Sequence, residues 1–173
     1  MVSPIKKTLK IAYIGFLLAL ALCFGYLESL IPIAIGIPGV KLGLSNLPVI
    51  ICLYLFDFPI AMFLTILKAI ICGFLFGNLY GIIYGLAGAI LSCSVMGIAK
   101  KTNLFHIPFV SSLGGIFHNI GQLLVACFVV ETFAVIYYFP VLLLAGLITG
   151  IVTGFISSII LPYLNKFIKR SEL

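Results

Sequence analysis

The sequence predicts an all-α integral membrane protein, a bundle of six transmembrane helices in which the second helix is short or broken. Of the 173 residues, 64% are hydrophobic and only 8% are charged, and the mean hydropathy is +1.37. A soluble domain could not cover its surface with so few charges. A membrane-spanning helix takes about 20 apolar residues, and polar breaks divide the chain into about six such segments. We therefore expect a single membrane domain over residues 1–173.

Each expected span is bounded by a charged residue or by proline and glycine. The first span ends at Glu28, because the prolines and glycines between 32 and 39 prevent a regular helix there. Short turns at 57–59, 77–78 and 100–106 separate the next spans. The expected spans are residues 9–27, 42–56, 59–76, 79–99, 107–130 and 137–164.

The second segment is too short to cross a membrane as a continuous apolar helix. Its apolar run, 47–56, is about half of a span. The helix must therefore begin within 41–46 or be broken. Irregular polar backbone at membrane depth is tolerated only where it is buried in protein or lines a cavity.

The positive charges predict the orientation. Eight of the ten Lys and Arg residues fall on one side of the expected topology. The positive-inside rule then predicts a multi-pass protein of the cytoplasmic membrane with both termini in the cytoplasm. The formal charge of +6 thus reflects topology, and we expect no nucleic-acid partner. The eight residues are Lys6, Lys7, Lys10, Lys100, Lys101, Lys166, Lys169 and Arg170.

Lys68 is the first candidate binding residue, because it is the only charge within the apolar run 60–76. A cation near the middle of a span costs about 2.5 to 3.5 kcal/mol on insertion scales, so it normally faces a partner, a cavity or a ligand. A purely structural role would require an internal carboxylate partner and no cavity. Lys41 is the other lysine that lies outside the eight residues used to predict the orientation, and it is in the loop after the first span.

Three polar side chains share one face of the fifth span. His118 and Gln122 are four residues apart, and Asn119 and Gln122 are three apart. Polar residues in membrane helices often only join neighbouring helices through hydrogen bonds. Three together beside several glycines favour a face that contacts a ligand.

Glu28 and Lys41 flank the outer loop, and Asn46 lies at the start of the short second helix. A helix N-terminus that points into a cavity beside a lysine can bind an anion, and broken helices mark substrate sites in transporters. For Glu28 and Lys41, a salt bridge that holds the loop is an equally good interpretation.

Small residues recur at four-residue spacing on three spans, which lets helix backbones approach closely in lipid. We favour packing within the bundle over docking of a partner as their role. The stripes are Gly15, Ala19 and Cys23; Gly81, Gly85 and Ala89; and Gly146, Gly150, Gly154 and Ser158.

Signatures of catalysis are missing from the sequence. It has no Gly-Lys dipeptide and hence no P-loop. Asp57 is its only aspartate, so paired aspartates cannot hold magnesium around a diphosphate. His106 and His118 have no carboxylate or thiol at catalytic spacing, and the five cysteines lie in apolar runs. We therefore expect no enzymatic activity, no cofactor and no metal site.

The segments Glu28-Ser-Leu-Ile-Pro32, Pro38-Gly-Val-Lys-Leu-Gly-Leu-Ser-Asn46 and Gly114-Gly-Ile-Phe-His-Asn-Ile-Gly-Gln122 together resemble a known membrane family. It is labelled heptaprenyl diphosphate synthase component I, or Gx transporter, and it is similar to the substrate-binding S components of energy-coupling factor transporters. The resemblance extends over about 9–164.

The resemblance implies a six-helix binding subunit that captures a small molecule from outside and docks on a membrane scaffold subunit driven by two ATPase subunits. Docking through small residues on the first span would use Gly15 and Ala19, although no strict Ala-x-x-x-Ala occurs there. The label also makes an isoprenoid or quinone precursor a candidate cargo.

We therefore expect an S-component-like substrate-binding subunit for a small polar or anionic molecule. The alternative is a membrane accessory component of a prenyl diphosphate synthase. The expected substrate-binding residues are Glu28, Lys41, Asn46, Lys68, His118, Asn119 and Gln122.

Overall fold

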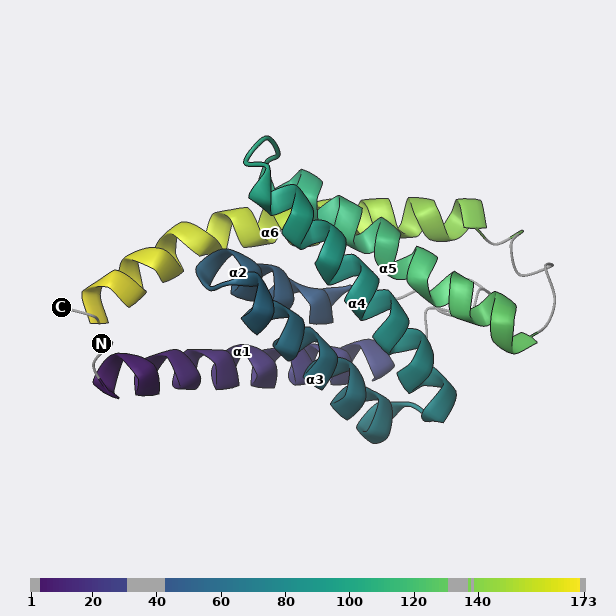
Figure 1. Cartoon of the computed structure of the whole chain (residues 1–173), viewed down its shortest axis with the longest axis horizontal. Helices are drawn as coiled ribbons and strands as arrows, with labels where there is room; N and C mark the ends of the chain where they lie inside the picture. The colour runs from purple at the N-terminus through teal and green to yellow at the C-terminus, as the bar shows by residue number, and fades with distance from the viewer. Residues whose placement is uncertain (1–3, 31–42, 131–136, 138, 172–173) are drawn as a thin grey trace.

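A computed structural model describes residues 4–30, 43–130, 137 and 139–171, and the described chain is helical almost throughout. Five helices are long and apolar enough to cross a membrane, and a shorter apolar helix lies among them (Figure 1). The all-α membrane fold is thus confirmed, with its short second helix. The helices are α1 (Pro4–Leu30), η1 (Leu44–Asn46), α2 (Leu47–Leu55), α3 (Phe58–Phe76), α4 (Leu79–Lys101), α5 (Ile107–Val130) and α6 (Phe139–Ser171).

The observed helices extend beyond the expected spans at both chain ends. α1 begins at Pro4, a residue type that suits the first turn of a helix. α6 continues through Pro162 to Ser171, beyond the expected end at 164. Hydropathy identifies only the apolar part of a helix, which lies in lipid. Basic residues in the last turn interact favourably with the helix dipole and so stabilise the helix past its apolar part. α6 bends in its C-terminal part, shown in yellow in Figure 1, and its internal proline explains a bend.

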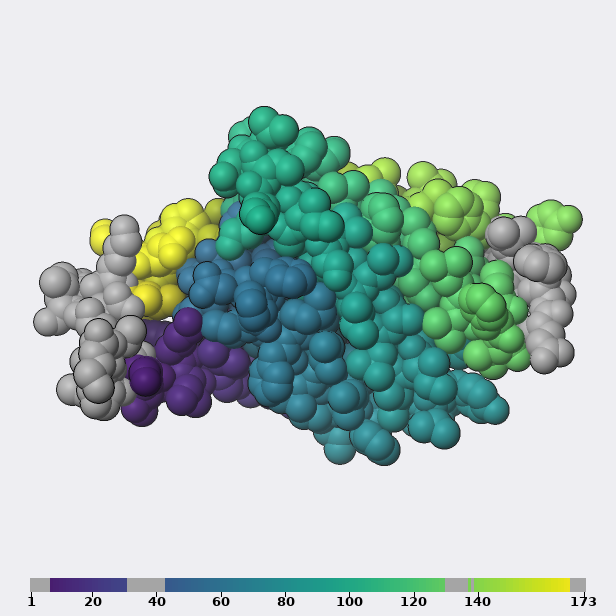
Figure 2. Space-filling model, in the orientation of Figure 1, coloured from purple at the N-terminus to yellow at the C-terminus, as the bar shows by residue number. Residues whose placement is uncertain are grey.

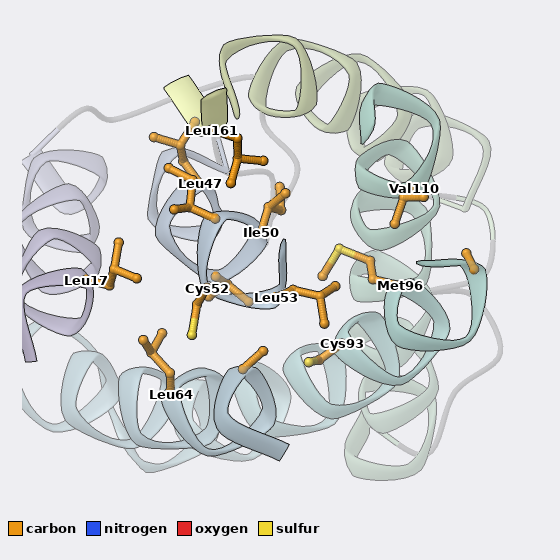
Figure 3. Close-up of a cluster of buried hydrophobic side chains, with 14 residues drawn as sticks. Leu17, Leu47, Ile50, Cys52, Leu53, Leu64, Cys93, Met96, Val110 and Leu161 are labelled. Atoms are coloured by element: carbon orange, nitrogen blue, oxygen red, sulfur yellow. The ribbon is translucent and has the colours of Figure 1, made fainter. Parts of the chain in front are cut away.

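The short helix α2 forms the centre of the hydrophobic core. Seven of its nine residues, Leu47–Leu53, are buried. In Figure 3 its side chains are surrounded by labelled residues from the five longer helices. Those residues are Leu17 of α1, Leu64 of α3, Cys93 and Met96 of α4, Val110 of α5 and Leu161 of α6. α2 therefore fills one half of the bundle and leaves the other half without a central helix.

Lysines mark the end of the bundle at which α2 finishes. Lys100 Nζ of α4 donates to the backbone oxygen of Leu53 at 2.5 Å and to that of Phe56 at 3.5 Å. Lys10 Nζ of α1 lies 5.7 Å from the centroid of the Phe56 ring. The first turn of α1 and the last turn of α6 lie at this end as well (Figure 1). We call it the basic end.

The small residues of α6 pack against α5. A Cβ atom on Gly150 would meet Ser112 Cα at 2.5 Å, and one on Gly146 would meet the backbone oxygen of Gly115 at 2.6 Å. Ser111 Oγ donates to the backbone oxygen of Gly150 at 2.6 Å across this interface. For this stripe the packing interpretation agrees with the structure.

The helices α3, α4 and α5 form one continuous face of the molecule (Figure 2). Exposed side chains of these helices include Phe63, Phe74 and Phe128. Because a soluble protein rarely leaves so much apolar surface open, this exposure agrees with contact to lipid.

Candidate substrate-binding cavity

A cavity of about 280 Å³ lies in the half of the bundle opposite the basic end. Residues of α1, η1, α3, α4, α5 and α6 line it, and they include polar side chains from five of these elements, all except α4. Six of the seven predicted binding residues are among them. They are Glu28, Asn46, Lys68, His118, Asn119 and Gln122. The seventh, Lys41, lies outside the described residues.

Lys68 joins the cavity wall to the start of the short helix. Its side chain is only 7% exposed, and its Nζ donates to Asn46 Oδ1 at 2.7 Å. Asn46 is the last residue of η1 and directly precedes α2. An ammonium group has three N–H donors, so this contact is compatible with a ligand contact from the same group. The lysine thus places a positive charge beside the N-terminus of α2.

Glu28 anchors the backbone that enters η1. One carboxylate oxygen, Oε1, accepts a hydrogen bond from the backbone N–H of Leu44 at 2.7 Å. Gly43, just before it, has a φ of 74°, a left-handed conformation that glycine adopts without strain. The carboxylate therefore holds η1 against α1. The alternative pairing of Glu28 with Lys41 involves a residue outside the described range.

The polar face of α5 serves both the cavity and the bundle. Asn119 Nδ2 donates to the backbone oxygen of Leu142 on α6 at 2.6 Å, so this amide joins two helices as well as lining the cavity. His118 and Gln122 lie against α4, where a Cβ on Gly88 would come within 3.0 Å of His118 Nδ1 and Gln122 Cγ. Glycine at 88 therefore lets these two side chains lie beside the α4 backbone.

The small residues of α4 line the cavity. Gly81, Gly85 and Ala89 all belong to the lining, and a Cβ on Gly85 would meet no atom within 4 Å. The packing interpretation therefore does not hold at Gly85. This stripe gives the cavity its width.

Cys72 and Thr149 are among the lining residues that sequence reasoning did not assign to a binding site. Cys72 lies four residues after Lys68 on α3, so helical spacing from the lysine could have identified it. Thr149 of α6 also lines the cavity, and its Oγ1 donates to the backbone oxygen of Ala145 at 2.9 Å. No sequence signal separates Thr149 from the other small residues of α6.

The lining offers charge and hydrogen bonds to a ligand. It presents an ammonium group, an imidazole, side-chain amides, a carboxylate and hydroxyl groups. Among the described residues, no three His, Cys, Asp or Glu side chains come together in a way that could hold a metal ion. The arrangement is suited to recognising a small polar molecule.

Fold and cavity together define a multi-pass α-helical membrane protein with a small polar pocket. A family model described as heptaprenyl diphosphate synthase component I matches residues 17–160, most of the 173-residue chain. The chain belongs to this family, which confirms the resemblance seen in the sequence. No curated protein and no solved structure matches it. The matched range contains all six cavity residues that were predicted.

Proposed function

We propose that this protein is a substrate-binding membrane subunit, similar to the S components of energy-coupling factor transporters, that captures a small polar or anionic molecule. The observation that carries the proposal is the convergence of six predicted residues on one cavity, with a buried lysine in its wall. We infer a binding role and not a catalytic one.

The buried charge supports an anionic or strongly polar ligand. An ammonium group in a low-dielectric setting is stabilised by a nearby negative charge far more than in water. The N-terminus of α2 is the positive end of a helix dipole, which favours negative charge at the same place. The cavity volume of about 280 Å³ is near the lower end of the range for ligand pockets, about 300–1,000 Å³. The ligand, or the part of it that enters, is therefore small.

The charge distribution supports access from outside. The basic end carries Lys7, Lys10, Lys100 and Lys101, and the positive-inside rule places such clusters in the cytoplasm. When both termini face the cytoplasm, the cavity lies in the outer half of the bundle. A molecule that binds there is captured from outside the cell, as import requires.

Energy for import would come from partners, because the chain has no P-loop. The proposed partners are a membrane scaffold subunit and two ATPase subunits. Gly15 and Ala19 on α1 are both exposed, and a Cβ on Gly15 would meet no atom within 4 Å. This open stripe supports docking of a partner helix on α1.

The family description favours a second candidate function, a membrane accessory component of a prenyl diphosphate synthase. In that case the anionic ligand would be an isoprenoid or quinone precursor, and the stable partner would be a soluble prenyltransferase. Purification from the native membrane separates the two functions. A scaffold subunit with ATPases supports the first, and a prenyltransferase without them supports the second.

Mass spectrometry of small molecules released from the purified protein tests the binding role. We expect an anionic or polar molecule from the wild type and its loss from Lys68→Ala and Gln122→Ala. Lys101→Ala, which alters an exposed lysine at the basic end, is the matched control. Equal release from all four proteins would contradict the proposal.

A further inference from the structure

An apolar groove of about 240 Å³ lies near the basic end, separate from the polar cavity. Phe16 and Leu20 of α1 line one side, and Leu164 of α6 lines the other. Between them lie Ile51 and Leu55 of α2, of which Ile51 is buried. The groove is therefore a gap between α1 and α6 with α2 as its floor.

The groove has the chemistry of a hydrocarbon site. All twelve of its lining residues are hydrophobic, and the hydroxyl of Tyr13 is the only side-chain heteroatom among them. Phe16 is 60% exposed, so the groove opens on the surface of the bundle. In a membrane this surface faces lipid chains, and a chain that fills the groove gains van der Waals contacts with its walls.

Positive charges lie where the groove meets the basic end. Leu55 of the floor is followed by Phe56, and Lys10 Nζ lies 5.7 Å from the Phe56 ring centroid. Lys7 is exposed one helical turn earlier on α1. Asp57, also exposed, contributes one negative charge nearby, which leaves the region positive. Lysines at this position attract anionic head groups at the membrane surface.

We propose that this groove binds an acyl chain of an anionic phospholipid whose phosphate contacts Lys7 and Lys10. The combination of a hydrocarbon-lined gap and adjacent ammonium groups distinguishes an anionic lipid from a neutral one. The site uses none of the polar cavity residues, so it does not depend on the cavity's ligand. The lipid would bridge α1 and α6 and stabilise the splayed arrangement of these two helices.

The chain contains no tryptophan, so one introduced tryptophan reports its own site. We would place it at Phe16→Trp in the groove and, as a control, at Phe155→Trp, which is also 60% exposed but outside the groove lining. The full-length proteins are reconstituted in phosphatidylcholine vesicles. These contain an equal minor fraction of either brominated phosphatidylglycerol or brominated phosphatidylcholine, and fluorescence quenching is measured.

We expect brominated phosphatidylglycerol to quench Phe16→Trp more strongly than brominated phosphatidylcholine, with no such difference at Phe155→Trp. Lys7→Gln and Lys10→Gln in the Phe16→Trp background should each lower the relative affinity for the anionic lipid about fivefold. Lys7 is exposed, so its replacement leaves the packing of the bundle intact.

Three results would overturn the proposal. Equal quenching by both lipids at Phe16→Trp would show a groove without head-group selection. Quenching at Phe155→Trp alone would show that protein, such as a second copy of this chain, covers the groove. A phosphatidylglycerol preference unchanged in both lysine variants would remove the two lysines from the site.

Discussion

Among single residues, Lys68 and Glu28 have structural roles in addition to the binding roles proposed for them. Lys68 holds Asn46 at the start of α2, and Glu28 holds the backbone of Leu44 at the start of η1. The sequence could identify Lys68 as a charge at membrane depth, where its cost requires a partner, a cavity or a ligand, and Glu28 as the charge that ends the first span beside the outer loop. It could not show that each contacts the same short segment, because that contact depends on how α1, α3 and η1 come together.

Glu28 allows its two roles to be separated. Glu28→Gln keeps an oxygen that can accept the N–H of Leu44, whereas Glu28→Ala removes it. If the carboxylate mainly positions η1, we expect Glu28→Gln to bind ligand like the wild type and Glu28→Ala to lose stability by about 1–3 kcal/mol. Ligand affinity and thermal unfolding in detergent measure these effects. Loss of binding in Glu28→Gln with normal stability would instead assign the charge to the ligand.

Among the helices, α2 determines where the cavity lies. Its ten-residue apolar run predicted a half-length helix, and the structure confirms that helix and buries it in the half of the bundle that includes the basic end. The N-terminus of α2 consequently reaches the middle of the bundle, beside Lys68.

The small-residue stripes show where sequence reasoning fails. Small residues at the same four-residue spacing pack α6 against α5, line the cavity on α4 and are exposed on α1. The spacing determines which residues share a helix face, but not which element lies next to that face.

Lys100 caps the C-terminus of α2, so its loss should destabilise the core. Lys100→Ala removes the donor to the backbone oxygens of Leu53 and Phe56, and we expect a loss of about 1.5–3 kcal/mol. The neighbouring variant Lys101→Ala is the control, because Lys101 is exposed. Thermal unfolding in detergent compares them, and equal unfolding temperatures would exclude the capping role.

The glycines of α4 and α6 should respond differently to the same substitution. Gly85→Leu extends into open space at the cavity, so we expect normal folding and loss of the ligand. Gly150→Leu would meet the backbone of Ser112, so we expect loss of folded protein. Size-exclusion profiles and bound ligand are the measurements. Full ligand retention in a folded Gly85→Leu protein would place the ligand elsewhere.

For the whole molecule, charge asymmetry and the position of α2 divide the bundle into a basic, filled half and a polar, hollow half. The sequence could predict most of this, since hydropathy predicted the spans and lysine placement predicted which helix ends lie on the basic side. The orientation in the membrane stays a prediction. It could not predict the groove between α1 and α6, because the distance between two helices depends on how the whole bundle packs, and no local sequence pattern predicts that packing.

Cys72 in the cavity wall provides a test of orientation. In a variant that retains only this cysteine, a membrane-impermeant thiol reagent should react from the outside, and ligand should slow the reaction. Cys52 and Cys93 are buried in the core and should stay unreactive when retained alone. Labelling of Cys72 only from the cytoplasmic side would reverse the proposed topology.

Whether Lys68 recognises an anionic ligand can be measured directly by native mass spectrometry of the intact protein released from detergent. We predict one small-molecule adduct per chain in the wild type and in Lys101→Ala, and none in Lys68→Met, which replaces the buried ammonium with an apolar side chain of similar length. An adduct of the same mass and occupancy in Lys68→Met would contradict the assignment of Lys68 to the binding site.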